Sequence, residues 1–361
     1  MPTYNKAESL RRLVPELMEV FGRAGRSRYE IIIVDDNSPD GTGAVADELA
    51  AAHPGLIHVV HRPGKAGLGT AVVAGWEVAR APILAAMDAD GQHPPGVLIG
   101  LLRGIEGGAD LAVASRYAAG GATLGWNPLR LLGSRLGTLF TRLLLPGVAH
   151  LRDPLSGCFA LRREVIAGKE LQPLGYKIVL EVLAYGDARK IIEVPYTFSG
   201  RQAGRRSLHA LGAFLAHLLV LAWVTGNFHR LARFLSVGFS GTAISLGLLA
   251  LLRELTPLAL VLCGAASSAV GLLVNFFLNE FWTFADWSRH DSAWRSRLHR
   301  LAKFLAICAG GVLAYLVTLL LLTHFLGVHY LWAGAAGVVV SALWNYGLNA
   351  NVTWRAPRLA A

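Results

Sequence analysis

The sequence predicts an α/β domain with a doubly wound, mainly parallel sheet, followed by an interfacial helix and four transmembrane helices. Two features of the 361-residue chain lead to this prediction. Up to about residue 200, strand-like apolar runs alternate with helix-like segments, which is the order that builds a parallel sheet. Beyond that point apolar segments dominate, and they raise the hydrophobic content to 53%, too high for a single soluble domain.

Apolar runs and turn residues place the strands and helices in order. Runs that are apolar throughout are typical of parallel strands, because both faces of such a sheet are covered. A sheet of this kind normally has a strand directly before the loop that opens this chain, and we expect that strand to be missing or reduced to a stub. The expected strands cover residues 29–34, 57–60, 82–87, 110–114 and 191–198, and a loop at 153–161 enters another. The expected helices begin near Ala7 and cover residues 43–51, 68–80, 95–105, 129–145 and 176–185.

Two carboxylates, Asp88 and Asp90, follow the expected strand at 82–87. In open α/β sheets, ligand sites lie at the carboxyl ends of the strands. Two carboxylates lie close together there at low cost only when a positive charge joins them, and carboxylate oxygens suit Mg²⁺ or Mn²⁺. The alternative is that both residues only cap the helix that begins near Pro95.

The chain carries a formal net charge of +10, which indicates an anionic partner. It lacks a stripe of Arg and Lys interleaved with aromatic residues, so an anionic substrate or a membrane surface is favoured over nucleic acid. Its three cysteines, at positions 158, 263 and 308, are far apart in apolar surroundings. This spacing indicates packing residues rather than a disulfide or a metal set.

Four apolar segments are each long enough to span a bilayer. Arg and Lys cluster before the first segment, between the second and third, and after the last, whereas the two hairpin links hold at most one Arg. By the positive-inside rule, these basic zones and the N-terminal domain lie in the cytosol, and we expect no signal peptide before that domain. The predicted spans are about residues 232–252, 258–280, 304–326 and 331–350.

A shorter apolar stretch, residues 206–229, separates these two regions. It is short for a span and is flanked by arginines, so we expect a helix that lies in the membrane interface. A fifth span is the alternative, but five spans would place the soluble domain on the wrong side of the membrane. The predicted domains are residues 1–205, 206–229 and 230–361 of an integral membrane protein.

The four spans form two repeats. Asn275–Asn279 is matched 70 residues later by Asn345–Asn349, and the same offset relates Thr283 to Thr353. Repeats with an even number of spans have the same orientation in the membrane, so these repeats are parallel rather than inverted. Asparagines near a span end are costly unless they are hydrogen-bonded, and we expect them to serve helix packing rather than a transport site.

Seven short motifs stand in order along the chain: Pro2–Asn5, Val34–Asp40, Asp88–Pro95, Ser115–Tyr117, Asp153–Leu161, Gly175–Lys177 and Val194–Phe198. The first four together resemble glycosyltransferase family 2, which implies the inverting GT-A fold. The last three are similar to the dolichol-phosphate (polyprenol-phosphate) mannose synthase branch of that family. The repeated spans resemble the GtrA-like membrane module. One departure from the family pattern is Lys6, where the family often has an acidic residue.

The resemblance implies a role for each candidate site residue. The residues implied to hold Mg²⁺ or Mn²⁺ are Asp88, Asp90 and Gln92. Those implied to bind the lipid phosphate are Arg116, Arg130 and Ser134, and the implied catalytic set is Asp88, Asp90 and Arg116. The nucleotide-sugar set is Pro2, Tyr4, Val34, Asp36, Asp88, Ala89, Asp90, Lys177, Arg201 and Ser207. In that set, Asp36 would lie near the base or ribose and Ala89 would back the diphosphate.

The implied reaction is transfer of mannose from GDP-mannose to a polyprenyl (dolichyl) phosphate at the cytosolic membrane face. The donor leaves as a diphosphate, and a metal ion stabilises the negative charge that grows on it. The lipid phosphate is already an anion at neutral pH, so it needs positioning by arginine forks rather than a general base. In-line attack at the anomeric carbon would invert its configuration. For Arg116, Arg130 and Arg201, a solubilising surface role is the alternative.

Two other functions are compatible with these motifs. One is a polyprenyl-phosphate glucosyltransferase that uses UDP-glucose. The other is a lipid-linked sugar flippase or binding protein with a decayed catalytic domain, and the intact Asp88, Asp90 and Arg116 argue against it. A polyprenyl chain cannot leave the bilayer, so a catalytic domain must work at the surface of membrane lipids, here in a bacterial or archaeal type of cell membrane.

Overall fold

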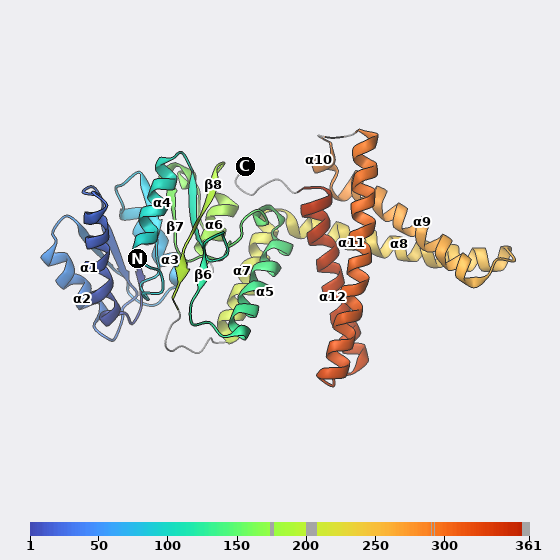
Figure 1. Cartoon of the computed structure of the whole chain (residues 1–361), viewed down its shortest axis with the longest axis horizontal. Coiled ribbons are helices and arrows are strands. Elements are labelled where there is room, and N and C mark those ends of the chain that lie inside the picture. Colours follow the sequence, from blue (N-terminus) through green and yellow to red (C-terminus); the bar gives the residue numbers. More distant parts are fainter. Residues whose placement is uncertain (174–176, 200–207, 290, 292, 356–361) are drawn as a thin grey trace. The chain divides into compact units, whose positions relative to one another are not determined.

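The fold is that of a computed structural model. The residues that this structure describes are 1–173, 177–199, 208–289, 291 and 293–355. The chain divides into two compact units. Unit 1 comprises Met1–Leu139 and His150–Leu221, and unit 2 comprises Phe140–Ala149 and the helices from Ala222 on. Two helices, α5 (Pro128–Leu144) and α7 (Leu208–Val224), therefore belong partly to each unit (Figure 1).

Unit 1 contains two main sheets whose strands are mainly parallel, as predicted. The first sheet has the order β1-β2-β3, and all its strands are parallel. The second has the order β4-β7-β5-β8, in which β7 runs antiparallel to both neighbours while β5 pairs in parallel with β8. A short parallel pair, β6 with β9, stands apart. The strands are β1 (Pro2–Thr3), β2 (Ile31–Asp35), β3 (Ile57–His61), β4 (Ile83–Ala86), β5 (Leu111–Ser115), β6 (Ala122–Thr123), β7 (Phe159–Arg162), β8 (Ile191–Pro195) and β9 (Thr197–Phe198).

Helices cover both faces of the first sheet, as a doubly wound fold requires. Ile31 and Ile33 belong to one core cluster with residues of α1, α2 and α4. The side chains of Ile32 and Val34 instead approach Gly75 on α3. Successive strand residues point to opposite faces, so this alternation places α3 on the other side. The helices are α1 (Ala7–Arg23), α2 (Thr42–Ala52), α3 (Leu68–Val78), α4 (Gly96–Glu106) and α6 (Ile178–Tyr185).

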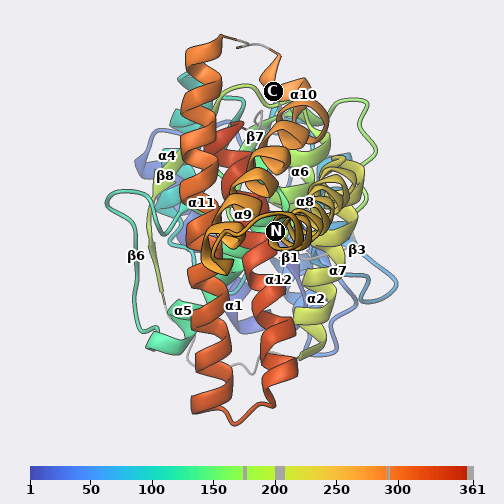
Figure 2. The ribbon, with the colours of Figure 1, turned by 90° about the vertical axis from the view of Figure 1, so that its right-hand side faces the viewer.

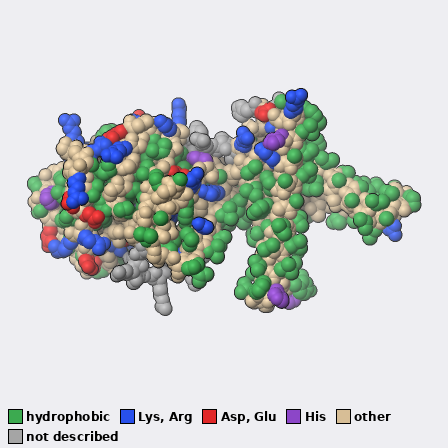
Figure 3. Space-filling model, in the orientation of Figure 1, with side chains coloured by type: hydrophobic (Ala, Val, Ile, Leu, Met, Phe, Trp, Pro, Cys, Tyr) green, Lys and Arg blue, Asp and Glu red, His purple; other side chains and the backbone are tan. Residues whose placement is uncertain are grey.

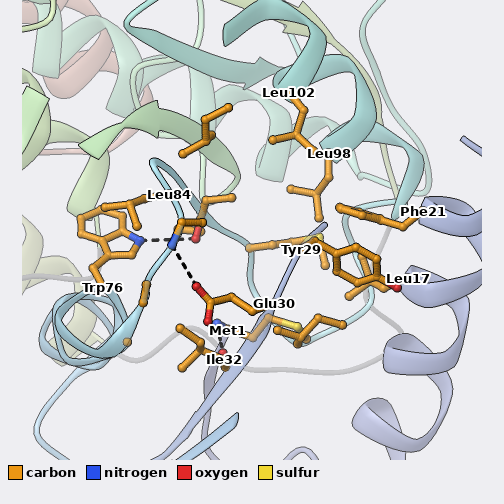
Figure 4. Close-up of a pocket in the computed structure, with 18 of the residues that line it drawn as sticks. Met1, Leu17, Phe21, Tyr29, Glu30, Ile32, Trp76, Leu84, Leu98 and Leu102 are labelled. Atoms are coloured by element: carbon orange, nitrogen blue, oxygen red, sulfur yellow. Dashed lines mark hydrogen bonds between the residues drawn. The ribbon is translucent and has the colours of Figure 1, made fainter. Parts of the chain in front are cut away.

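The expected stub is β1, whose two residues pair with the end of β2. The Met1 ammonium group donates to the Ile32 carbonyl oxygen at 2.7 Å, and burial lowers the pKa of this amine to about 5. Beside it, a cavity of about 480 Å³ runs along β2 and β4, with Phe21, Trp76 and Leu84 in its mainly apolar wall (Figure 4). Among the described residues, none of the predicted site residues lines this cavity.

Unit 2 contains four helices that are long and apolar enough to cross a membrane, in agreement with the four predicted spans. Hydrophobic side chains cover these helices, and Lys and Arg gather near α10 (Ala285–Ser288) (Figure 3). α8 packs along α9, and α11 along α12 (Figure 2). The four helices are α8 (Asn227–Leu255), α9 (Leu260–Leu278), α11 (Trp294–Leu320) and α12 (Tyr330–Leu348).

The helix expected in the interface is α7, which has 17 residues and is not one of these four. Within unit 1 it buries Phe214, His217 and Leu218. The His217 Nε2 atom lies 2.6 Å from the Glu181 carboxylate of α6. One side of α7 therefore packs on α6 within unit 1, while Leu219 remains about half exposed. A location in the membrane interface remains a prediction.

The predicted repeat is visible in the aromatic core of unit 2. This core contains three pairs of equivalent positions, each pair separated by 70 residues in the sequence: Phe234 and Phe304, Phe276 and Tyr346, and Phe284 and Trp354. Their contacts are reciprocal, because the ring centroids of Phe234 and Tyr346 lie 5.7 Å apart and those of Phe304 and Phe276 lie 5.8 Å apart. Phe284 and Trp354 stack on each other at 4.4 Å. Reciprocal contacts of this kind are those of a two-fold arrangement.

The repeated asparagines lie at close helix crossings. A Cβ atom on Gly241 would collide with the amide of Asn275, and one on Gly311 would collide with that of Asn345. Small residues let membrane helices approach closely, which supports the predicted packing role of these asparagines.

One ion-pair cluster differs between the repeats. Glu280, just beyond α9, is 1% exposed and accepts hydrogen bonds from Arg300 at 2.5 and 3.0 Å and from the Trp354 indole at 2.8 Å. Replacing Glu280 with Ala leaves Arg300 buried without its counter-charge. We therefore expect the variant to lose about 3–5 kcal/mol in its free energy of unfolding, measured by thermal unfolding in detergent.

The repeat supplies a matched control for this prediction. Arg230, 70 positions before Arg300, pairs at 2.6 Å with Asp286, whose side chain is 57% exposed. Because exposed ion pairs contribute little, Asp286→Ala should change the free energy of unfolding by less than about 1 kcal/mol. Equal losses in the two variants would contradict the prediction.

Candidate functional site

The predicted carboxylate pair lies just beyond the carboxyl end of β4. The Asp88 side chain is 29% exposed, yet the surrounding protein removes enough water to raise its pKa to about 6. The charge of Asp90 also raises the pKa of Asp88, while that of Lys177 lowers it. Asp90 is oriented by a hydrogen bond of 3.1 Å from the backbone N–H of Gln92. Between the two acids, the Ala89 carbonyl accepts a hydrogen bond of 2.6 Å from Ser9.

A buried histidine stands beside the pair but carries no positive charge. His93 Nε2 lies 3.9 Å from the Asp88 carboxylate, and its ring stacks on Tyr196 with centroids 5.2 Å apart. Burial, followed by the nearby charges of Lys177 and Arg116, lowers the pKa of His93 to about 3. The imidazole is therefore neutral at physiological pH and does not neutralise the carboxylates.

This donor set fits a hard divalent cation. The fit rests on two neighbouring carboxylates, of which Asp88 has a pKa raised by burial and, to a smaller extent, by the charge of Asp90. A cation beside them would favour the charged form of both groups. Gln92 donates from its Nε2 atom to the Ser199 carbonyl at 3.1 Å, and its Oε1 atom is its remaining donor atom for a metal. Among the described residues, no cluster of three His, Cys, Asp or Glu side chains is present. A site with only one or two protein carboxylates is typical of Mg²⁺, because this ion usually completes its coordination shell with water and substrate phosphate.

Four of the predicted nucleotide-sugar residues, namely Pro2, Tyr4, Val34 and Asp36, lie at or beside the end of β2. Pro2 pairs with Val34, and Asp36 follows directly as a buried carboxylate. Arg62 donates to Asp36 at 2.8 Å, so Asp36 is held by a partner from the loop after β3. From the same loop, the Lys65 ammonium group lies 4.4 Å from the centre of the Tyr4 ring.

The three residues predicted to bind a lipid phosphate converge on two aromatic rings. The guanidinium groups of Arg116 and Arg130 lie 5.5 and 4.3 Å from the Trp126 ring. The Tyr117 hydroxyl donates to the Ser134 hydroxyl at 2.8 Å, and the Arg116 guanidinium lies 5.3 Å from the Tyr117 ring. Cation–π contacts of this kind hold arginines in place without using up their N–H groups.

Arg116 is also held by a buried ion pair. Its Nε and Nη2 atoms donate to the two carboxylate oxygens of Asp153 at 2.7 and 2.6 Å. Burial alone would lower the pKa of Arg116, but the hydrogen bonds and charge of Asp153 raise it above its ordinary value. The arginine therefore remains charged although its side chain is only 9% exposed.

The predicted site residues that the structure describes thus form groups that follow β2, β4 and β5, and several of their partners were missed. Lys177 immediately precedes α6 and acts on Asp88 through its charge, whereas Arg201 and Ser207 lie outside the described residues. The missed partners are Arg62, Lys65, Trp126 and Asp153. Two sequence features could have indicated them. Asp153 lies in one of the seven motifs, and Arg62 and Lys65 lie in a glycine-rich loop that follows a predicted strand.

Comparisons with known proteins cover nearly the whole chain. Residues 1–168 match Glycosyl transferase family 2, and residues 233–358 match the GtrA/DPMS transmembrane domain. The chain is 38% identical to the dolichol-phosphate mannosyltransferase of Pyrococcus furiosus over 98% of both proteins. It is 40% identical to the polyprenol monophosphomannose synthase of Mycolicibacterium smegmatis over 64% of this chain and 88% of that protein.

Among solved structures, the chain is similar to mannosyl-3-phosphoglycerate synthase from Rubrobacter xylanophilus. The likeness covers 61% of this chain and 70% of that chain, with 23% sequence identity and a TM-score of 0.45.

Proposed function

Because the chain belongs to the dolichol-phosphate mannosyltransferases of glycosyl transferase family 2, we propose that its donor is GDP-mannose and that transfer is metal-dependent and inverting. The acceptor of this reaction is a polyprenyl (dolichyl) phosphate. One observation carries the proposal: a carboxylate pair that fits a divalent cation lies in the same unit as two arginines gathered on one tryptophan ring. The charge of Arg116 contributes to the lowered pKa of His93, and His93 Nε2 lies 3.9 Å from the Asp88 carboxylate, which supports the two groups being neighbours.

On the donor side, the residues bind and orient the nucleotide sugar. Asp88, Asp90 and Gln92 would hold the metal ion, which when bound stabilises negative charge on the departing diphosphate. Tyr4 and the Arg62-held Asp36 would receive the nucleoside at the end of β2. Loops at the carboxyl ends of parallel strands are the usual place for such a ligand.

On the acceptor side, the residues position an anion that is already reactive. The first ionisation of a lipid phosphate is complete at neutral pH, so no side chain has to remove a proton. Arg116 and Arg130 would grip its oxygens, and Ser134 would add a hydrogen bond. With the acceptor on one side of the sugar and the diphosphate on the other, attack in line inverts the anomeric carbon.

The membrane helices explain how such an acceptor is reached. A polyprenyl chain stays in the bilayer, and the four apolar helices of unit 2 would keep the enzyme there. Arg and Lys lie in the first turns of both α8 and α11, at corresponding ends of the two helical hairpins. By the positive-inside rule, we place those ends and the catalytic domain at the cytosolic face of a bacterial or archaeal cell membrane.

A donor screen tests the proposal directly. Detergent-solubilised protein is incubated with Mg²⁺ or Mn²⁺, a polyprenyl phosphate and one radiolabelled nucleotide sugar at a time, and labelled lipid is counted after extraction. We expect label from GDP-mannose at a rate at least about 100-fold above that from UDP-glucose, because a site that hydrogen-bonds one base rejects another strongly. Faster labelling from UDP-glucose would overturn the proposed donor.

A further inference from the structure

A single loop, Arg152–Cys158, lies against both Arg116, which we propose binds the acceptor phosphate, and Asp88 of the carboxylate pair. We infer that this loop is a positioning element that sets Arg116 and Asp88 against each other, with Asp153 and Gly157 as its two contact points. The inference rests on the proposed function, since it concerns how the acceptor phosphate and the donor site are held at a reacting distance. It adds residues to which neither the motifs nor the comparisons assign a role.

At the first contact point, Asp153 binds one edge of the Arg116 guanidinium group and leaves the other edge open. Its carboxylate takes the Nε and Nη2 side of the guanidinium group, and its Oδ2 atom also accepts the Arg116 backbone N–H at 3.0 Å. Within the described residues, the Nη1 atom of Arg116 has no hydrogen-bond partner. Arginine donates along a rigid fork, so holding one edge aims the remaining N–H groups in a fixed direction.

Asp153 is itself held rigidly by the neighbouring strand. Glu193 on β8 accepts the backbone N–H groups of Arg152 and Asp153, each at 2.9 Å. β8 pairs in parallel with β5, the strand whose end carries Arg116. The loop is therefore connected to β8 through Glu193 and to the end of β5 through the Arg116–Asp153 ion pair. The Asp153 side chain is completely buried. A carboxylate anchored in this way can hold the Arg116 guanidinium group in one orientation.

A proton-accepting role for Asp153 does not fit this geometry. Both of its oxygens are occupied by Arg116, and a proton on either would break the pair. Breaking a buried ion pair is costly, because one charge is left without its partner. The acceptor phosphate also needs no base. Asp153 therefore acts through Arg116.

At the second contact point, Gly157 lies directly against Asp88. A Cβ atom at Gly157 would stand 2.5 Å from the Asp88 Oδ2 atom, closer than real Cβ contacts allow. The absence of a side chain lets the loop backbone lie on the carboxylate. Three residues lie between Asp153 and Gly157. The Ser156 hydroxyl donates to the Cys158 carbonyl at 3.2 Å and accepts the Cys158 backbone N–H at 3.3 Å, which tightens the segment. The loop is thus a short, braced link between the two halves of the site.

The test compares Asp153→Asn and Gly157→Ala in the lipid-labelling assay, with the wild-type protein as reference. For Asp153→Asn we expect the KM for a short polyprenyl phosphate to rise about tenfold or more, while the KM for the nucleotide sugar stays within about twofold. For Gly157→Ala we expect the Mn²⁺ concentration for half-maximal activity to rise about tenfold, with little change in acceptor KM. A general loss of structure would not split the constants in this way.

A matched control and a double variant sharpen the result. Asp110 precedes β5 at its other end and accepts two backbone N–H groups at 2.7 and 2.8 Å, so Asp110→Asn should lower stability but leave both KM values unchanged. If Asp153 acts through Arg116, then adding Asp153→Asn to Arg116→Lys should raise the acceptor KM no further than the worse single variant does.

The inference fails if folded Asp153→Asn has a wild-type acceptor KM, or if its effect adds fully to that of Arg116→Lys. If Asp153→Asn does not fold, Glu193→Gln takes its place, since it loosens the loop while keeping the ion pair. An increase of about threefold or more in its acceptor KM supports the inference, and an unchanged value overturns it. Failure of the proposed function is a different result, because the wild-type protein itself would then label no lipid.

Discussion

Replacing Asp90 with Asn is expected to reduce mannosyl transfer by about 100- to 1000-fold, the size of effect seen when an electrostatic stabiliser of a transition state is removed. The substitution keeps the side-chain shape and the oxygen that accepts the Gln92 N–H, but it removes the charge that would help to hold the metal ion. The rate of lipid labelling is measured at saturating Mg²⁺ or Mn²⁺. Wild-type protein stripped of metal by a chelator should be as slow as the variant.

Metal addition provides the decisive comparison for this prediction. Added Mn²⁺ should restore the chelator-treated wild-type protein and leave Asp90→Asn slow. Asp110→Asn, which alters a structural carboxylate at the far end of β5, should retain the wild-type rate. Full activity of Asp90→Asn, or a normal rate in the stripped wild-type protein, would rule out the metal role proposed for this pair.

Arg116→Ala is expected to lose both activity and stability. The substitution removes an acceptor-binding arginine and leaves the buried Asp153 carboxylate unpaired, which costs about 3–5 kcal/mol in the free energy of unfolding. Transfer should fall by at least about 100-fold, because interactions of a charged group with phosphate are lost as well. Thermal unfolding in detergent and the lipid-labelling rate are measured on the same preparation.

Arg130→Ala is the matched comparison for Arg116→Ala. The Arg130 guanidinium lies over the same Trp126 ring but on the partly exposed α5 helix. Its loss should raise the KM for the polyprenyl phosphate and change the free energy of unfolding by less than about 1 kcal/mol. If Arg116→Ala is as stable as Arg130→Ala, the ion pair with Asp153 contributes less than its burial indicates.

Local patterns predicted the elements of the fold well. In the α/β part, the ends of the main predicted strands and helices lie within about two residues of those observed, because apolar runs and turn residues are properties of short segments. Among the membrane helices, α8 and α11 begin earlier than the predicted spans, since their first turns carry basic residues that the apolar pattern leaves out. The four spans and their 70-residue repeat were also predicted, since span length and equal spacing are visible in one dimension. The direction of β7 was not predicted, because strand direction depends on the path of the chain between distant segments.

The candidate site was predicted at the points where strands end in charged residues. Asp88, Asp90 and Arg116 each follow a buried strand, and such ends meet at one edge of a parallel sheet. Their partners were not predicted. Arg116 and Asp153 are 37 residues apart, and Asp36 and Arg62 are 26 apart, so no local pattern links them. The individual roles of these residues in binding and catalysis remain predictions.

The order of the residues was enough to establish an α/β enzyme with a carboxylate-ended strand and a repeated membrane module. Periodicity, strand ends and internal repetition are local or evenly spaced features, and each leaves a direct trace in the chain. Only the folded molecule decided which charges are paired and which remain open, as with Arg116 held side-on by Asp153 and Asp88 lying under Gly157. Pairing depends on the close approach of distant segments, and burial then sets the strength of the resulting interactions.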